Sequence, residues 1–322
     1  MTMRSAEDWA HAVAKGEWDA RLAPLYPGEE GWRSRYLEAL GAFSRHFGEG
    51  RPALLASAPG RTELGGNHTD HQRGRVLAAA VSLDMVAAVS PNGDLRVRVR
   101  SKGMPDVDVD LSSLARVKEE EGTSAALVRG VMAGIAALGG NIGGFDAALV
   151  SAIPVGAGLS SSAAYEILMG TILNALYNCN TLTPAQLACV GHMAENVYFN
   201  KPCGMMDQTA CAEGGVVSID FRDPQRPLIE KIARDFGAHG YRLFITNAGG
   251  SHAGLTEEYA AIPREMQAVA KALGAKHLRF ADERAFYGRL PELRRALGDR
   301  PVLRAMHFFD ENRRAQLEAE AL

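Results

Sequence analysis

The stretch 154–166, PVGAGLSSSAAYE, constrains the fold of this chain more than any other. An apolar run at 145–153 precedes it, bounded by glycines and by Pro154, as is typical of a β-strand. After the stretch, apolar side chains recur at helical spacing from Tyr165 to Leu176. A glycine- and serine-rich turn therefore joins a strand to the start of a helix. Backbone N–H groups and the positive end of the helix dipole converge at such a turn, which suits a phosphate group.

Two familiar phosphate-binding loops do not match this turn. No Gly-Lys-Ser/Thr follows the glycines, so the turn is not a Walker A loop. A dinucleotide-binding turn fits poorly, because the third glycine is lacking and no acidic residue is evident on a following strand. The serine hydroxyls could bond a phosphate or contact a metal ion. Taken alone, the turn leaves both phosphate binding and a plain helix-capping role open.

Composition narrows the class of protein. The 322 residues are 47% hydrophobic and carry 35 basic and 38 acidic side chains, which suits two domains with their own cores. No basic block indicates nucleic acid, and no apolar run of about 18 residues indicates a membrane span. The N-terminus has no apolar core typical of a secretory signal. The four cysteines lack metal-binding spacing, so we expect reduced thiols and a cytoplasmic location.

Along the rest of the chain, strands and helices are mixed without strict alternation, which predicts an α+β fold. Residues 5–48 are expected to form two or three short helices that serve as a packing element or a partner surface. The strict alternation at 95–100 predicts an edge strand with one side facing water. Further helices should begin at 123–124 and 183–184, and the chain from 255 should be mainly helical. Further strands are expected at 53–58, 216–220 and 243–247, and residues 75–90 form a longer apolar run.

A second polar cluster occupies 58–71, APGRTELGGNHTDH, directly after a predicted strand. Its asparagine, histidine and aspartate side chains can both donate and accept the hydrogen bonds that a polyhydroxylated ligand needs. An elaborate polar turn is the alternative. A metal site at His68 and His71 is disfavoured, because no third ligand is evident.

A third cluster comprises Glu195 and the segment 200–208, NKPCGMMDQ. Glu195 lies near the end of a predicted helix, where the dipole disfavours an acid unless a cation meets it. A magnesium ion could be that cation, and a solvated glutamate is the alternative. Asp207 could be a functional carboxylate or a structural N-cap.

Together the three clusters resemble those of the galactokinases, within the GHMP kinase superfamily. The Ala-Pro-Gly-Arg and His-Thr-Asp segments are similar to the galactokinase signature, and Pro-x-Gly-x-Gly-Leu-Ser-Ser-Ser-Ala is similar to the superfamily's ATP loop. Pro-Cys-Gly-x-Met-Asp-Gln resembles the segment that carries the catalytic aspartate. The order and approximate separations also fit, over about residues 45–320.

The resemblance implies roles for individual residues. Arg61 and Asp207 would be catalytic, with Asp207 facing the sugar C1 hydroxyl. An aspartate beside an arginine stays ionised at neutral pH, so it would orient the hydroxyl and accept its proton late. Magnesium would be held by Ser162 and Glu195. The residues implied to bind the sugar are Asn67, His68, Thr69, Asp70, Gly204 and Tyr259. The residues implied to bind the phosphates of ATP are Gly156, Ala157, Gly158, Leu159, Ser160, Ser161 and Ser162.

The implied fold has an N-terminal domain related to ribosomal protein S5 domain 2 and a ferredoxin-like C-terminal domain. With this pattern we expect a helical extension at 1–48, an ATP- and sugar-binding domain at 49–214, and a C-terminal domain at 215–322. The superfamily's third, glycine-rich motif is not found near the C-terminus, so the C-terminal domain is expected to be incomplete. The implied activity is ATP- and magnesium-dependent phosphorylation of galactose, or a similar aldohexose, at the anomeric hydroxyl. A non-catalytic sugar- and ATP-binding regulator and a kinase for another metabolite are the alternatives.

The sequence departs from the galactokinase pattern at four places. Asn67 stands where these proteins usually carry Glu, and Glu63 stands where they usually carry Asn. His71 replaces a usual Tyr, and the residues around Ser124 lack a tryptophan that stacks on adenine in some relatives. The change at 67 removes a charge-assisted hydrogen bond from the sugar pocket, and therefore leaves the identity of the sugar open.

Overall fold

A computed structural model describes residues 3–29, 31–154, 156–234, 236–246 and 256–322. The chain divides into two compact units, each of which is described by itself. Unit 1 comprises residues 1–60, 81–201 and 211–213, and unit 2 comprises residues 61–80, 202–210 and 214–322. The long strands β2 (Pro52–Gly65) and β3 (Arg75–Pro91) contribute residues to both units.

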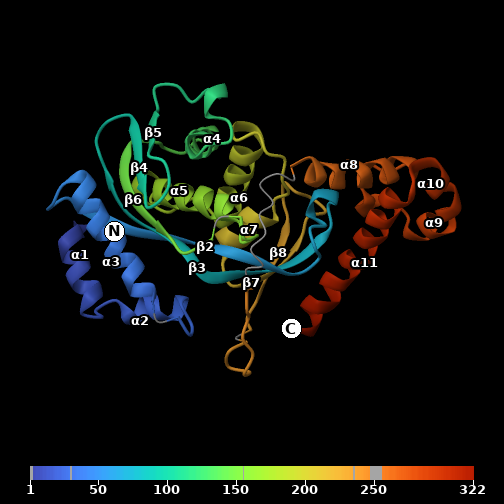
Figure 1. The fold of residues 1–322 in the computed structure, drawn as a ribbon, viewed down its shortest axis with the longest axis horizontal. Helices are drawn as coiled ribbons and strands as arrows, with labels where there is room; N and C mark the ends of the chain where they lie inside the picture. Colours follow the sequence, from blue (N-terminus) through green and yellow to red (C-terminus); the bar gives the residue numbers. More distant parts are fainter. Residues whose placement is uncertain (1–2, 30, 155, 235, 247–255) are drawn as a thin grey trace. The chain divides into compact units, whose positions relative to one another are not determined.

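Unit 1 is built on a mixed sheet. Its strand β6 (Phe145–Ser151) pairs antiparallel with β3 and parallel with β4 (Arg96–Ser101). Strand β5 (Val107–Asp110) then pairs antiparallel with β4, and β1 (Arg4–Ser5) pairs with the start of β2. The resulting strand order is β1-β2-β3-β6-β4-β5 (Figure 1). The α+β fold predicted from the mixture of strands and helices is confirmed.

Helices cover both faces of this sheet. Successive residues of a strand point to opposite sides, so alternate residues of β6 enter two different cores. Ala147 and Leu149 of β6 enter a core shared with α4 (Ser124–Ala137), α5 (Ser161–Tyr177) and α6 (Pro184–Met193). Ala148 and Val150 enter a second core, shared with α1 (Ala6–Ala14) and α3 (Trp32–Phe47). The short α2 (Asp19–Leu22) and the 3₁₀ turn η1 (Ala23–Leu25) connect α1 to α3. Figure 1 shows the two groups of helices on opposite faces.

The N-terminal helices are anchored to β3 by a buried polar cluster. The hydroxyl of Tyr26 donates to Oδ2 of Asp84 at 2.5 Å and lies 2.7 Å from the hydroxyl of Tyr36. Arg35 donates from Nε to Oδ1 of the same aspartate at 2.9 Å. Burial and the charge of Asp84 raise the pKa of Tyr26, which keeps its hydroxyl protonated as a donor. Of the two roles predicted for this region, the structure shows the packing element.

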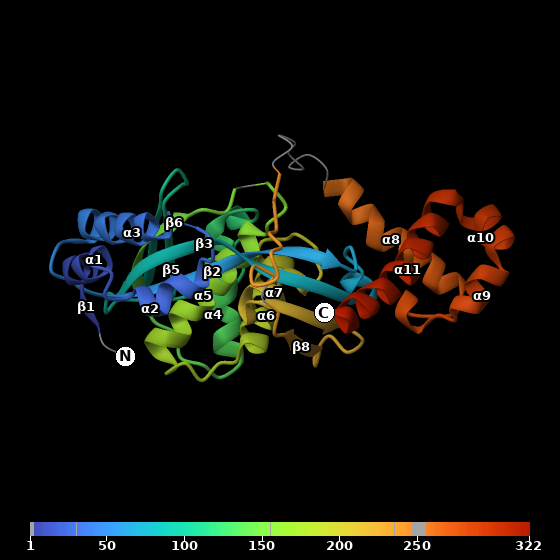
Figure 2. The ribbon, with the colours of Figure 1, turned by 90° about the horizontal axis from the view of Figure 1, so that it is seen from below.

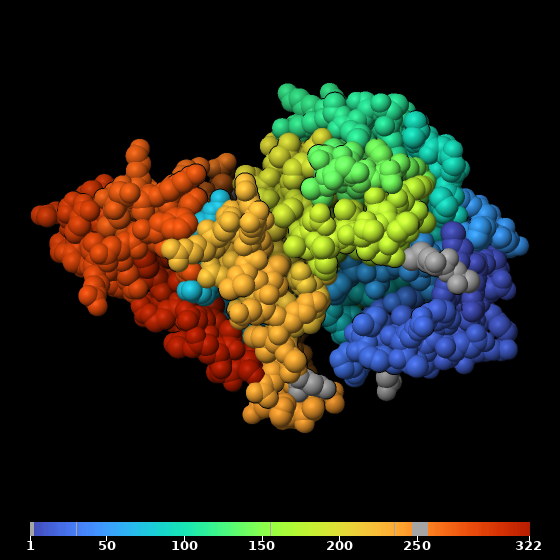
Figure 3. Space-filling model, turned by 180° about the vertical axis from the view of Figure 1, so that it is seen from behind, coloured from blue at the N-terminus to red at the C-terminus, as the bar shows by residue number. Residues whose placement is uncertain are grey.

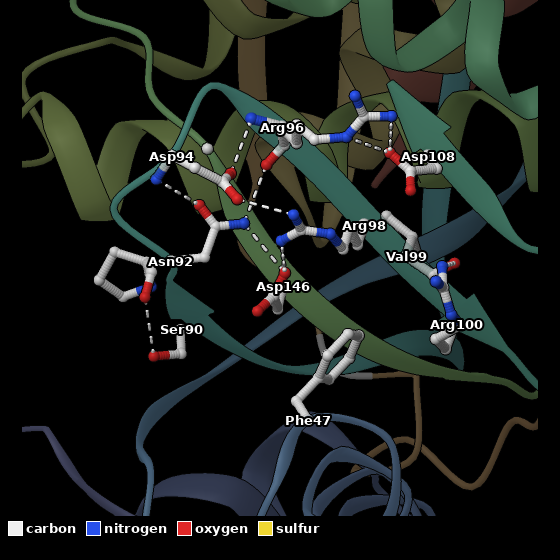
Figure 4. Close-up of polar contacts among 12 residues, drawn as sticks. Phe47, Ser90, Asn92, Asp94, Arg96, Arg98, Val99, Arg100, Asp108 and Asp146 are labelled. Atoms are coloured by element: carbon white, nitrogen blue, oxygen red, sulfur yellow. Dashed lines mark hydrogen bonds and ion pairs between the residues drawn. The ribbon is translucent and has the colours of Figure 1, made fainter. Parts of the chain in front are cut away.

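Strand β4 is not the edge strand that its alternating sequence predicts, because β5 lies beyond it. Val97 and Val99 face the helical core, while the arginines of the strand point to the other side. There Arg98 pairs with the buried carboxylate of Asp146 at 3.0 Å (Figure 4). The alternation of apolar and polar residues indicates that the strand has one apolar and one polar face. The polar face is compatible with an inner strand because its arginines form ion pairs.

Unit 2 combines the other ends of β2 and β3 with two further strands. The first residues of β3 pair antiparallel with β7 (Val216–Asp220), which pairs antiparallel with β8 (Leu228–Ile232). Strand β7 confirms the prediction for 216–220. The strand predicted at 243–247 is wrong over its described part, because 241–246 has no regular structure and Phe244 is exposed; residue 247 lies outside the described residues. An apolar run alone does not provide a pairing partner.

The C-terminal part of unit 2 is helical, as predicted. Helices α8 (Thr256–Ala272), α9 (Glu283–Gly288), α10 (Leu290–Leu297) and α11 (Asp299–Ala321) pack around one core (Figure 2). Phe286 and Phe308 are its largest fully buried side chains. The surface of these helices appears in orange and red in Figure 3. Within the described ranges, no helix has both the length and the apolar character needed to cross a bilayer.

Candidate active site

An arginine and an aspartate far apart in the sequence form a two-point ion pair in unit 2. Arg61 lies on β2, and Asp207 lies in the first turn of α7 (Met206–Glu213). Nε of Arg61 donates to Oδ1 of Asp207 at 2.8 Å, and Nη2 lies 2.6 Å from Oδ2. Two parallel N–H···O bonds fix the orientation of a carboxylate as well as its position. The guanidinium side chain is 7% exposed and the carboxylate side chain 27%, so the carboxylate is the member that faces outward.

Asp70 holds the start of the helix that carries this carboxylate. Its Oδ2 accepts the backbone N–H of Met206 at 3.1 Å, and its Oδ1 accepts that of His71 at 3.0 Å. Gly204 passes so close that a Cβ at this position would overlap the Asp70 carboxylate. The structure therefore brings together Asp70, Gly204 and Asp207, three residues that the sequence predicts for the site.

The loop between β2 and the 3₁₀ turn η2 (Asp70–Gln72) carries the predicted sugar ligands Asn67, His68 and Thr69. The side chains of Asn67 and His68 are exposed, and both residues have left-handed backbones, with φ of 47° and 62°. Thr69 is instead fully buried and donates its hydroxyl to the carbonyl of Arg75 at 2.5 Å. Its side chain shapes the loop in this structure. Tyr259 lies in the first part of α8 with its side chain more than half exposed.

The predicted phosphate loop lies between β6 and α5 in unit 1. Gly156 and Gly158 have φ of 76° and 75°, and Ser160 enters the helix with φ of 56°. Left-handed residues turn the chain sharply enough for backbone N–H groups at the helix start to face a common point. Leu159 is buried and anchors the loop to the core below it. The strand–turn–helix arrangement predicted from the sequence is confirmed.

Gly60, which precedes Arg61, packs directly against the predicted phosphate loop. A Cβ at this position would lie 2.9 Å from the carbonyl oxygen of Leu159 and 3.3 Å from that of Leu83. Contacts of real Cβ atoms are almost never as short as 2.9 Å, so a larger residue would push the loop away. The sequence analysis assigned no role to this glycine, although its place between a proline and an arginine with a predicted role was a signal.

The two predicted metal ligands also lie together in unit 1. The hydroxyl of Ser162 donates to Oε1 of Glu195 at 2.9 Å. Glu195 is 2% exposed and belongs to a π-helical turn (Ala194–Tyr198) that follows α6 directly. A hydroxyl and a carboxylate are hard oxygen ligands of the kind that Mg²⁺ prefers. Among the described residues no cluster of three or more ligating side chains occurs, so water and phosphate oxygens would complete the shell.

Lys201 supplies the cation that the position of Glu195 requires. Its Nζ lies 2.9 Å from Oε1 of Glu195, the same oxygen that accepts from Ser162. The lysine side chain is 54% exposed. The sequence left a magnesium ion and a solvated glutamate open at this position and did not identify the lysine six residues away.

Family models of known proteins match the segments of the chain that contain these residue clusters. A family model described as "Galactokinase galactose-binding signature" matches residues 41–91, and "GHMP kinases N terminal domain" matches 122–215. A galactokinase of Actinobacillus pleuropneumoniae serotype 3 is 34% identical over 285 residues, which cover 87% of this chain and 71% of that protein. A galactokinase of Streptomyces coelicolor is 33% identical over 270 residues, covering 82% and 68%.

The chain belongs to the galactokinase family. Its fold is that of the GHMP kinases. The crystal structure of Lactococcus lactis galactokinase complexed with galactose superposes with a TM-score of 0.71 at 23% identity, covering 88% of this chain and 74% of that one. Kinases of this family take ATP as co-substrate.

Membership of the galactokinase family gives the Arg61–Asp207 pair its context. The galactose-binding signature covers Arg61, Asn67 and Asp70, and the superfamily domain covers Asp207 and Glu195. The roles of these residues remain predictions, and the geometry described above is compatible with them. Glu63, which sequence reasoning noted only as a departure from the pattern, proves to be a largely buried carboxylate inside the signature.

Proposed function

We propose that this protein transfers the γ-phosphoryl group of ATP to the anomeric hydroxyl of galactose, giving the sugar 1-phosphate. The two-point pair between Arg61 and Asp207 carries this proposal. Phosphoryl transfer has a loose transition state, so positioning and charge neutralisation supply most of the catalysis. A carboxylate fixed at both oxygens and facing outward is suited to hold an acceptor hydroxyl in one orientation.

In this proposal Asp207 accepts a hydrogen bond from the C1 hydroxyl and takes its proton late, as bond formation acidifies it. Arg61 holds the carboxylate and neutralises negative charge on the transferred group. Asp70 uses two acceptor sites for backbone N–H groups. A carboxylate has about four such sites, which leaves capacity for a sugar hydroxyl. Asn67, His68, Gly204 and Tyr259 complete the proposed sugar site, and Thr69 shapes it.

The loop Gly156–Ser162 would bind the phosphates of ATP, through its backbone N–H groups and serine hydroxyls. Ser162 and Glu195 would hold magnesium, since their oxygens form a fitting donor pair. When bound, this ion would neutralise charge on the phosphate oxygens. A non-catalytic regulator would need neither the Arg61–Asp207 pair nor its fixed geometry, so the pair favours a kinase.

The test is an assay of ADP release with ATP, magnesium and a panel of aldohexoses that includes galactose, glucose, mannose and talose. A parallel measurement records the thermal shift that each sugar causes. We expect galactose to raise ADP release well above the sugar-free rate. If no sugar does so, the proposed kinase activity is wrong, and a thermal shift without turnover would identify a sugar-binding regulator.

A further inference from the structure

The acidic group of the sugar loop stands at position 63 in this chain and not at 67. Glu63 and Asn67 are exchanged relative to the galactokinase pattern, and Glu63 is the one acidic residue between 61 and 69. Asn67 is exposed and adopts φ of 47°, a backbone that asparagine tolerates better than glutamate. The Glu63 side chain is only 12% exposed. The exchange therefore moves the carboxylate from the exposed tip of the loop to its base.

Glu63 lies on the same face of β2 as the catalytic arginine. Side chains two residues apart on a strand share a face, so Arg61 and Glu63 point to the same side. The charged groups that act on the Glu63 carboxylate from its own segment are Arg61, His68 and Asp70. On helix α11, Nε2 of His307 lies 3.1 Å from the carbonyl oxygen of Asn67, and the carboxylate of Glu318 would overlap a Cβ at Gly65.

The loop that Glu63 underlies has an unfavourable backbone. Gly66, Asn67 and His68 follow one another with φ of 103°, 47° and 62°. A left-handed conformation is unfavourable for a non-glycine residue, so neighbouring contacts must hold Asn67 and His68 in place. The backbone N–H of His68 lies 2.9 Å and 3.1 Å from the two carboxylate oxygens of Glu63. This charge-assisted contact fixes the last of the three residues.

We propose that Glu63 is a positioning residue, whose charge holds the loop Gly66–His68 in its sugar-binding conformation and thereby sets the affinity for the sugar. The inference rests on the proposed function, because it takes this loop as part of the sugar site. Glu63 acts through the His68 amide. Sugar binding therefore responds to the charge state of Glu63, although its carboxylate need not contact the sugar.

That charge state changes near neutral pH. Burial raises the pKa of Glu63 to about 7; Asp70 adds to the rise, while His68 and Arg61 oppose it. Since the folded-state pKa is raised, the folded protein binds this proton more tightly than the unfolded chain. The resulting stability is present below the ordinary pKa of glutamate and is lost as the pH rises through about 7. The ionised carboxylate thus strengthens the loop contact while lowering the stability of the fold.

The experiment compares wild type with Glu63→Gln, which keeps the shape and removes the charge. The galactose Kd is measured by calorimetry at pH 6, 7 and 8 without ATP, and the Tm is measured at pH 8. If only the ionised form binds well, wild-type affinity should rise by up to about tenfold from pH 6 to pH 8. Glu63→Gln should show no such rise and should bind about tenfold more weakly at pH 8, with an equal or higher Tm.

A matched control is Glu292→Gln, which makes the same change at an exposed ion pair on α10 and should behave as wild type. His71 and His277 have pKa values lowered by burial, and they are common to both proteins, so the difference between the variants isolates Glu63. If Glu63→Gln keeps the wild-type pH dependence, or lowers affinity and Tm together, the inference is overturned.

Hydrogen exchange of the free protein separates this inference from the proposed function. Protection of the segment 64–71, corrected for intrinsic rates, should rise from pH 6 to pH 8 in wild type and stay constant in Glu63→Gln. Wild type that binds no galactose would overturn the proposed substrate. If wild type binds no galactose but shows this exchange pattern, the positioning role of Glu63 would still hold for another sugar. If wild type shows neither galactose binding nor the exchange pattern, the proposed substrate and the positioning role are both wrong.

Discussion

Two carboxylates in the two units are held by cations in opposite ways. Asp207 faces outward and its partner Arg61 is buried, whereas Glu195 is buried and its partner Lys201 is half exposed. The guanidinium binds both oxygens of Asp207, while the ammonium shares one oxygen of Glu195 with the hydroxyl of Ser162.

The difference indicates which member of each pair a ligand can reach. A buried guanidinium fork is a fixed support, so the outward carboxylate of Asp207 is presented to a substrate in one orientation. An exposed ammonium on a flexible stem is exchangeable, so Lys201 can give way to another cation at Glu195. The first pair is suited to position a reacting group and the second to receive a metal ion.

The largest effect is expected from removing the outward carboxylate. Asp207→Asn keeps the size of the side chain but abolishes proton acceptance, so kcat should fall by at least about 10²-fold, the scale for a positioned general base. The Kd for galactose should change far less. Rapid-quench turnover and calorimetric binding measure the two quantities. A variant with near wild-type kcat would show that Asp207 does not act on the hydroxyl.

A smaller loss should follow from replacing the fork by a point charge. Arg61→Lys keeps the positive charge but cannot bind both oxygens of Asp207, so the carboxylate loses its fixed orientation. We expect kcat to fall roughly tenfold, or about 1.4 kcal/mol in transition-state stabilisation. Arg222→Lys, a change on a loop of the same unit, serves as the control for the substitution itself. Equal kcat in Arg61→Lys and wild type would mean that charge alone suffices.

The smallest effect concerns the exchangeable cation. Lys201→Met removes the competitor for Glu195, so Mn²⁺ should bind the nucleotide-free protein more tightly. The gain should be at most about fivefold, because an ion pair with a half-exposed lysine contributes less than ~1 kcal/mol. Electron paramagnetic resonance of free Mn²⁺ measures this affinity without turnover. Unchanged or weaker binding would show that Lys201 does not compete with the metal.

Two further variants serve as controls for the Mn²⁺ measurement. Lys102→Met removes a lysine from an exposed ion pair with Glu38 and should leave Mn²⁺ binding as in wild type. Glu195→Gln should abolish the binding in both the wild-type and the Lys201→Met background. If Mn²⁺ binds equally well without Glu195, the proposed metal site lies elsewhere.

The sequence predicted what depends on local patterns. The capping box of Thr183 and Gln186 begins α6, and Gly48 follows the end of α3, as local signals indicate. The position of β4 in the sheet could not be predicted, because alternation reports the two faces of a strand and not its neighbours. Pairing order is set by contacts between segments distant in the chain.

The candidate site shows the same division. The types of its residues and their order along the chain could be predicted from the sequence, whereas at Glu195 a cation and a solvated side chain both stayed open. Lys201 reaches Glu195 because of a π-helical turn and a left-handed Asn200 with φ of 65°. No local sequence pattern predicted either of these two features. The buried state of Glu63 likewise depends on how its loop folds back toward β2, which residue identities alone do not specify.

The most direct test of the account identifies the product by ³¹P nuclear magnetic resonance. The wild-type protein, ATP, magnesium and galactose are incubated beside the Asp207→Asn variant. We expect a new phosphate ester coupled to the C1 proton of the sugar in wild type, and at most a trace of it in the variant. A phosphate ester at any other carbon, inorganic phosphate alone, or equal product from both proteins would contradict it.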